Sequence, residues 1–389
     1  MLFQYLLWTV LAGNITGAAI EFTENLRLGP DQGDEYIWSS TKATVSVDAL
    51  GNMYVMDPKD YKISVYDPNG QLLKVIGKKG DGPGEFQKLM GFSATPNGAL
   101  GIDLPGGITA RSHQFGKEMQ FLGSKSQEGK PLILEMVVVS PSGKHFGAFY
   151  VQPDRVNKVM LFETAVFDNN LQLVKTISHK TGPLPDRSRM NEANYWVDRL
   201  SENLTRFFEG VGVFSFDEQG RLYSGQTQKY EITRWDPSMK KVQQLYQRSP
   251  KPKIMTEDDS NAVMDHLLNQ LSEDSELADL LTSSVVRQAL AKATLPPAKN
   301  PIYGVIPIKD GAVMVVTSLD LETRETLADV FATDGAWLGE VTVADFGLVR
   351  YAGGAYLPKM IFRGDYAYTI ITDENDDNIL VRYTYKLAQ

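Results

Sequence analysis

Short apolar stretches separated by turn residues run through most of the chain. Between residues 44 and 86 this pattern predicts four strands, at residues 44–47, 53–56, 62–66 and 71–76. Gly and Asn residues occupy the tight turns, where the backbone needs positive φ. Strands that follow one another through tight turns pair as an antiparallel meander, so this segment predicts one four-stranded sheet.

The same unit recurs along the chain, each time marked by a turn glycine before a short apolar strand. The six landmark glycines are Gly51, Gly98, Gly143, Gly220, Gly311 and Gly364. Their first spacings of 47 and 45 residues suit one propeller blade per unit. Packing such meanders around an axis buries the apolar face that each would otherwise expose. The sequence therefore predicts an all-β, six-bladed β-propeller of four-stranded antiparallel blades, one domain over residues 20–389.

The two ends of the chain fit a closed ring. The last unit offers strands at residues 366–371 and 379–385 and is then about one strand short. Residues 20–28 form a β run before the first full unit. We expect this N-terminal strand to pair into the last blade and remove its open edge.

One unit is regular enough to compare with a known repeat. Residues 51–57 (GNMYVMD), 63–67 (ISVYD) and 77–86 (GKKGDGPGEF) resemble an NHL-type repeat. The whole chain is similar to the bacterial secreted six-bladed propellers of the NHL/TolB-like group, with the tight match over residues 44–103. This resemblance implies architecture but not activity, because the superfamily includes sugar lactonases, amidating lyases, strictosidine-synthase-like enzymes and pure binding modules.

Two insertions lengthen the spacing between units. The first, within residues 179–210, is expected to be an exposed loop. The second, residues 248–300, has apolar residues at i+4 steps and predicts a helical hairpin inserted between blades 4 and 5. Connections in a meander alternate between two faces, so both insertions share a face with the loops between second and third strands. We expect this face to be functional, although the hairpin alternatively only covers the channel or an apolar patch.

Charge and composition exclude several classes of function. The net charge of −9 leaves no broad basic footprint, so we expect no nucleic-acid partner. The absence of cysteine excludes disulfides and thiol chemistry. Residues 1–19 carry no charged side chain, and residues 2–11 form a mostly apolar run that is too short to span a bilayer. This segment predicts a signal peptide cleaved after Ala18 or Ala19. An apolar N-terminal strand or helix is the alternative. We expect an exported protein, periplasmic or extracellular, without stable membrane insertion.

Candidate site residues come from strand ends and from the first insertion. Asp57 and Asp103 end the second strands of two successive units and could face the axis. Two carboxylates are fewer than a calcium site prefers. We therefore expect no metal and no cofactor. Arginine side chains and flat aromatic rings could together bind an anionic or sugar-like ligand. The alternative is that the arginines are ordinary charged residues of surface loops and the aromatic residues only pack between blades. The candidate ligand-binding residues are Asp57, Tyr61, Asp103, Arg111, Arg187, Arg189, Tyr195, Trp196 and Tyr230.

These patterns favour a non-catalytic propeller that binds a small ligand or a protein partner on the face bearing the blade-to-blade loops. The alternative function is a metal-assisted hydrolase or lyase of the lactonase-like kind. That chemistry requires carboxylates from several blades to converge on an ion at the axis.

Overall fold

The computed structural model describes residues 19–40, 42–128, 132–208, 210–256, 282–294, 296–319, 325–344, 348–350, 356–373 and 375–387. Residues 1–18 of the expected signal segment and the first helix of the expected hairpin lie outside these residues. Both therefore stay predictions.

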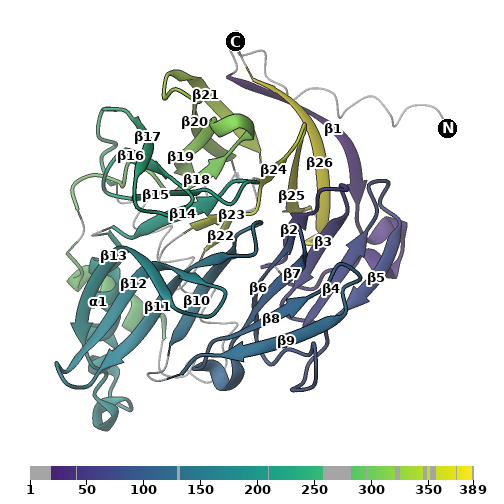
Figure 1. The fold of residues 1–389 in the computed structure, drawn as a ribbon. Coiled ribbons are helices and arrows are strands. Elements are labelled where there is room, and N and C mark those ends of the chain that lie inside the picture. The colour runs from purple at the N-terminus through teal and green to yellow at the C-terminus, as the bar shows by residue number, and fades with distance from the viewer. Residues whose placement is uncertain are drawn as a thin grey trace.

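Six four-stranded antiparallel sheets form the propeller, in the order of the chain around the ring (Figure 1). Blades 1 and 2 comprise β2 (Thr44–Val47), β3 (Met53–Asp57), β4 (Lys62–Tyr66) and β5 (Leu72–Ile76), then β6 (Leu89–Thr95), β7 (Gly98–Asp103), β8 (Arg111–Phe115) and β9 (Phe121–Ser126). Blades 3 and 4 comprise β10 (Ile133–Val139), β11 (His145–Asp154), β12 (Val159–Asp168) and β13 (Leu173–Pro183), then β14 (Gly212–Phe216), β15 (Leu222–Gln226), β16 (Glu231–Trp235) and β17 (Val242–Gln247). Blade 5 comprises β18 (Gly304–Pro307), β19 (Val313–Leu319), β20 (Glu325–Phe331) and β21 (Trp337–Ala344). The predicted six-bladed propeller is confirmed.

The sixth blade closes the ring with strands from both ends of the chain. Its order is β1 (Ile20–Leu28), β26 (Asn378–Leu387), β25 (Tyr366–Thr372) and β24 (Ile361–Arg363). β1 pairs antiparallel with β26 from Ile20 opposite Leu387 to Leu28 opposite Leu380, and the two strands lie side by side in Figure 1. The expected closing strand is therefore present. A small hairpin of β22 (Leu348–Arg350) and β23 (Tyr356–Pro358) precedes this blade.

The landmark glycines mark the turns between the first and second strands of the blades. All six have positive φ, from 60° at Gly364 to 133° at Gly98. At Gly98 an added Cβ would lie 2.0 Å from the backbone oxygen of Phe115. Glycine is needed there both for the backbone conformation and for the close approach of two backbone segments of the same blade.

Apolar clusters fill the gaps between neighbouring blades. Between blades 1 and 2, Met56 and Ile63 pack with Phe86 and Phe92. Between the closing blade and blade 1, Trp38 stands edge-on to the ring of Tyr66, with centroids 5.9 Å apart. The hydrophobic core of this fold is thus divided among the interfaces between blades. Packing at these interfaces holds the blades in fixed positions, and with them the loops at the blade ends.

The two insertions form one helical module. The first contains α1 (Ala193–Phe208), where we expected a loop; the second contains α3 (Ser283–Lys292), between the last strand of blade 4 and the first of blade 5. Val197 and Leu204 of α1 pack on Val285 and Ala289 of α3. α1 forms because its apolar residues recur at helical spacing and bury one face of the helix against the second insertion.

Candidate functional site

Asp57 lies at the end of β3 and is fully buried. Its carboxylate accepts hydrogen bonds from three backbone N–H groups, those of Ser39 at 2.7 Å, Lys59 at 3.0 Å and Asp60 at 3.4 Å. Asp57 therefore holds together the segment that leads into β2 and the loop that follows β3. Its side chain is occupied by the main chain of its own blade.

Asp103 occupies the equivalent place in blade 2 and is also fully buried. It accepts from the backbone N–H of Lys88 at 2.7 Å and of Gln87 at 3.1 Å, and from the guanidinium of Arg111. Burial alone would raise the pKa of Asp103. The His113 ring 3.7 Å away, the Lys88 and Gln87 amides and Arg111 outweigh that effect and lower its pKa to about 2.

A cleft of about 710 Å³ opens beside these two carboxylates. It lies where the inner strands of blades 1, 2 and 3 begin, on the same face as the two insertions. We call it the axial cleft, and its lining residues are Ser39, Ser40, Lys42, Met56, Pro58, Lys59, Lys88, Leu89, Met90, Leu134 and Glu135. The backbone segments that carry Lys59 and Lys88 are those bonded to Asp57 and Asp103.

Three lysines bring positive charge to the axial cleft. Lys42, Lys59 and Lys88 are exposed, and none of the ion pairs within the described residues engages their ammonium groups. Glu135 supplies the one carboxylate of the lining, at a bulge in β10. Burial raises the pKa of Glu135, against the opposing effect of Lys88 and Lys42. The cleft thus carries a local excess of positive charge in a chain of net charge −9.

The channel below the axial cleft is narrow and lined mostly by apolar residues. The inner strands leave a cavity of about 110 Å³ along the axis. Its walls include Val45, Phe92, Val137, Phe216, Ile306 and Phe362. In the part of the chain that the structure describes, no three His, Asp or Glu side chains are grouped to hold a metal ion.

The arginines and aromatic residues of the first insertion do not form an open surface. Tyr195, which we expected on an exposed loop, is buried, and its hydroxyl accepts from the backbone N–H of Asp186 at 3.0 Å. The indole N–H of Trp196 donates to the Met190 carbonyl at 2.7 Å, and Arg189 pairs with Glu192 at 3.0 Å. These contacts join the start of α1 to the turn before it. The side chain of Arg187 lies outside the described part of the chain.

The remaining predicted residues are spread over two places. Tyr61 has a φ of 58° and lies under the ammonium group of Lys79, 5.5 Å from the ring centroid. Arg111 is mostly buried and bonded to Asp103. Tyr230 lies between blades 4 and 5, lining a separate cavity. The structure therefore places Asp57 and Asp103 beside one cleft, whereas the lysines that line this cleft were missed because they share no motif spacing.

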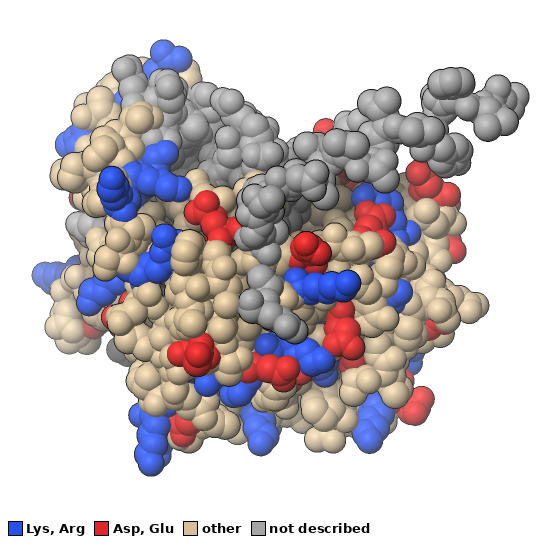
Figure 2. Space-filling model, turned by 90° about the horizontal axis from the view of Figure 1, so that it is seen from above, with Lys and Arg blue, Asp and Glu red and all other residues tan. Residues whose placement is uncertain are grey.

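Charges of both signs are interspersed over the side of the molecule seen in Figure 2. This distribution agrees with the absence of a broad basic footprint in the sequence. None of the helices among the described residues is long and apolar enough to cross a membrane.

The sequence matches no protein-family model and no curated protein. Solved structures share the architecture. A member of the duf4221 family from Bacteroides vulgatus is 12% identical, with a TM-score of 0.50 over 96% of this chain and 100% of that one. A Bacteroides fragilis protein provisionally described as exported is 11% identical, with a TM-score of 0.49 over 96% and 97% of the two chains.

Virginiamycin B lyase from Staphylococcus aureus also matches, at 8% identity and a TM-score of 0.43 over 94% of this chain and 99% of that one. The TM-score of 0.50 with the duf4221 structure agrees with a shared fold, and an identity this low leaves activity open. The chain is therefore a six-bladed β-propeller, and its function has to be argued from its own surfaces.

Proposed function

We propose that this protein is an exported, non-catalytic propeller that binds a small polyanion in the axial cleft. The observation that carries the proposal is the grouping of Lys42, Lys59 and Lys88 around one cleft of about 710 Å³. That volume is within the range of small-molecule sites. The cleft also lies on the face that bears the long blade-to-blade connections, where a rigid scaffold usually presents its binding loops.

The chemistry of lysine specifies the class of ligand. An ammonium group is a compact point charge with no preferred plane, so three of them suit a molecule with several negative groups in no fixed geometry. Di- and tricarboxylates and pyrophosphate have this character. Glu135 opposes such a ligand while it is ionised, and burial raises its pKa, which favours its neutral form relative to an ordinary glutamate.

The proposal is tested by isothermal titration of citrate and pyrophosphate into the wild type and into the double variant Lys59→Glu/Lys88→Glu. Two reversed charges should weaken binding by about 100-fold or more, since each charge-assisted contact contributes about 1.5–3 kcal/mol. The matched control is Lys117→Glu/Lys240→Glu, which changes the charge equally in two exposed turns on the other face. Control and wild type should have the same affinity.

Three outcomes would overturn the proposal: no binding by the wild type at about 1 mM, equal affinity of the cleft variant, or equal loss in the control variant. Protein freed of metal ions by passage over a chelating resin should bind as before. If this removal of metal abolishes binding, the metal-assisted alternative replaces the binding function.

Export and kinship with the NHL/TolB-like group are parts of the same proposal. Export is supported by the uncharged, apolar run over residues 1–19, and the kinship by the regular repeat over residues 44–103. Expression of the full chain in a bacterium should yield a periplasmic form whose N-terminus is Ala19 or Ile20. An uncleaved form confined to the cytoplasm would contradict export.

A further inference from the structure

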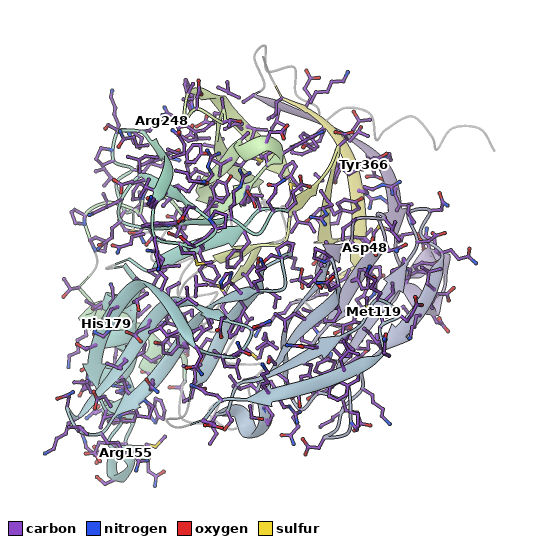
Figure 3. The ribbon with its side chains drawn as sticks, in the orientation of Figure 1. Asp48, Met119, Arg155, His179, Arg248 and Tyr366 are labelled. Carbon is purple, nitrogen blue, oxygen red and sulfur yellow. The ribbon has the colours of Figure 1, made fainter. Side chains whose placement is uncertain are left out.

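A second cavity, of about 570 Å³, lies between blades 4 and 5 on the same face as the axial cleft. Blade 4 contributes Gln228 and Tyr230, and blade 5 contributes Thr317, Asp329 and Glu340. Its outer wall is formed by the two chain segments that lead to and from the helical insertion. We call it the interblade cavity. Figure 3 shows Arg248, which also lines it, at the end of β17.

The base of the interblade cavity is a buried polar network centred on Asp329. Asp329 is 2% exposed and accepts from the indole N–H of Trp337 at 2.7 Å, from Arg248 and from the hydroxyl of Tyr230. The carboxylate therefore has three donors from two blades. Burial, and then the hydrogen bond to Asp329, raises the pKa of Tyr230, so its hydroxyl remains a donor. The base of the cavity is thus rigid and its negative charge is compensated.

Arg248 connects this network to the open part of the cavity. Its guanidinium lies over the Trp337 ring, with 4.2 Å from Cζ to the ring centroid, and its side chain is about one-third exposed. A guanidinium has five N–H donors, and only one of its nitrogens, Nη1, is bonded to Asp329. Within the described residues, the other nitrogens have no acceptor. They form a planar, charged edge held in position by the stacking on Trp337.

The outer wall of the interblade cavity is preorganised and largely apolar. Pro250, Pro252, Pro296 and Pro301 line it together with Ala298. The two segments are joined by backbone hydrogen bonds, from Lys299 to the Lys253 carbonyl at 2.8 Å and from Met255 to the Pro297 carbonyl at 3.2 Å. Proline fixes φ, so little conformational entropy is lost when a ligand contacts this wall.

The charges around the interblade cavity favour an anion. The lining holds Arg248, Lys251, Lys253 and Lys299 against Asp329 and Glu340. Asp329 is already engaged by Arg248, and Lys251 and Lys253 are exposed at the rim. An arginine fork matches the plane of a carboxylate, whereas the proline wall suits an apolar body.

We infer that the interblade cavity is a second binding site, specific for a monocarboxylate with an apolar ring or chain. The carboxylate binds the free edge of Arg248 near the rim lysines, and the apolar body lies against the prolines. This site does not depend on the lysines of the axial cleft. The interblade cavity offers one planar guanidinium, whereas the axial cleft offers several lysine point charges. The two sites should therefore select different ligands, a monocarboxylate and a polyanion.

The test uses 3-phenylpropionate as the probe and 3-phenylpropanol as its uncharged control. Protein labelled with 5-fluorotryptophan reports the location of binding, because the resonance of Trp337, assigned with Trp337→Phe, should shift on titration. Four of the five tryptophans follow the predicted signal segment, so the other three resonances of the mature protein act as internal references. The alcohol should cause no shift.

Two variants separate binding from folding. Arg248→Lys keeps a charge beside Asp329 but removes the planar fork, and Lys251→Glu/Lys253→Glu leaves the buried network intact. Each should weaken binding of 3-phenylpropionate by about tenfold or more, with a melting temperature close to that of the wild type. Lys59→Glu/Lys88→Glu should bind 3-phenylpropionate as the wild type does.

The inference is overturned if the wild type does not bind 3-phenylpropionate at about 1 mM. It is also overturned if the alcohol binds equally, if both cavity variants keep wild-type affinity, or if the Trp337 resonance does not move. Loss of binding in Lys59→Glu/Lys88→Glu would instead place the carboxylate in the axial cleft and refute the second site. Citrate binding in the axial cleft is unaffected by any of these outcomes.

Discussion

Replacing Asp103 by asparagine should destabilise the protein by about 3–5 kcal/mol at neutral pH. The carboxylate accepts from Gln87, Lys88 and Arg111, so an amide would place an N–H group against at least one of these donors. Lowering the pKa from 3.8 to about 2 corresponds to about 2 kcal/mol of stabilisation by the ionised form. The unpaired buried donor adds about 1–3 kcal/mol.

The pH dependence of this effect has a definite sign. Because the folded-state pKa of Asp103 lies below its unfolded value, its contribution is fully present well above pH 4 and is lost as the pH falls towards 2. Urea denaturation of both proteins at pH 7, 5 and 3 should give the same difference at the first two values. At pH 3 the ionisation part of the difference should fall to roughly half.

Asp81→Asn is the matched control for Asp103→Asn. Asp81 also contacts Arg111, at 3.4 Å, but its side chain is 67% exposed. Such an exposed pair contributes about 0.5 kcal/mol or less. If Asp103→Asn unfolds like the wild type at pH 7, or if its deficit does not shrink between pH 5 and pH 3, the structural role of Asp103 is refuted. Asp103 would then again be a candidate ligand-binding residue.

Two further predictions concern the backbone of the ring. Deleting residues 1–19 should leave the melting temperature unchanged. Deleting residues 1–28 should lower the melting temperature sharply, because it removes β1 and its buried end residues from the closing blade. Equal melting temperatures of the two deletion variants would refute strand closure. Gly98→Ala should cost about 2–4 kcal/mol in urea denaturation, because the new Cβ meets a backbone oxygen at positive φ. Gly106→Ala, also at positive φ but with open space around it, should cost about 1 kcal/mol, and equal losses would contradict the steric argument.

The architecture could be predicted because each blade repeats a local signal. A turn glycine with positive φ precedes each second strand, and the apolar pattern follows with the period of a strand. These features need only near neighbours in the sequence. The helix in the first insertion also had a signal, Trp196, Leu200 and Leu204 at i+4 steps, but the neighbouring arginines and aromatics suggested a binding loop.

The candidate site could not be predicted in the same way, because its members are brought together by the ring. Lys42, Lys59 and Lys88 come from three separate segments of blades 1 and 2 and converge only when these blades pack. Asp57 and Asp103 were recognised as equivalent from their positions at strand ends. No pattern in the sequence indicates that their carboxylates bind main-chain N–H groups. Position at a strand end therefore indicated importance without indicating the role.

The pairing of β1 with β26 also sets the order in which the molecule can fold. One hydrogen bond between them, from Thr384 to Thr23, joins residues 361 positions apart. Closing so long a loop is slow, and it cannot occur until the last strand of the chain has been synthesised. Until then β1 is an unpaired edge able to accept the β26 of another molecule, so refolding at high concentration should produce strand-swapped dimers.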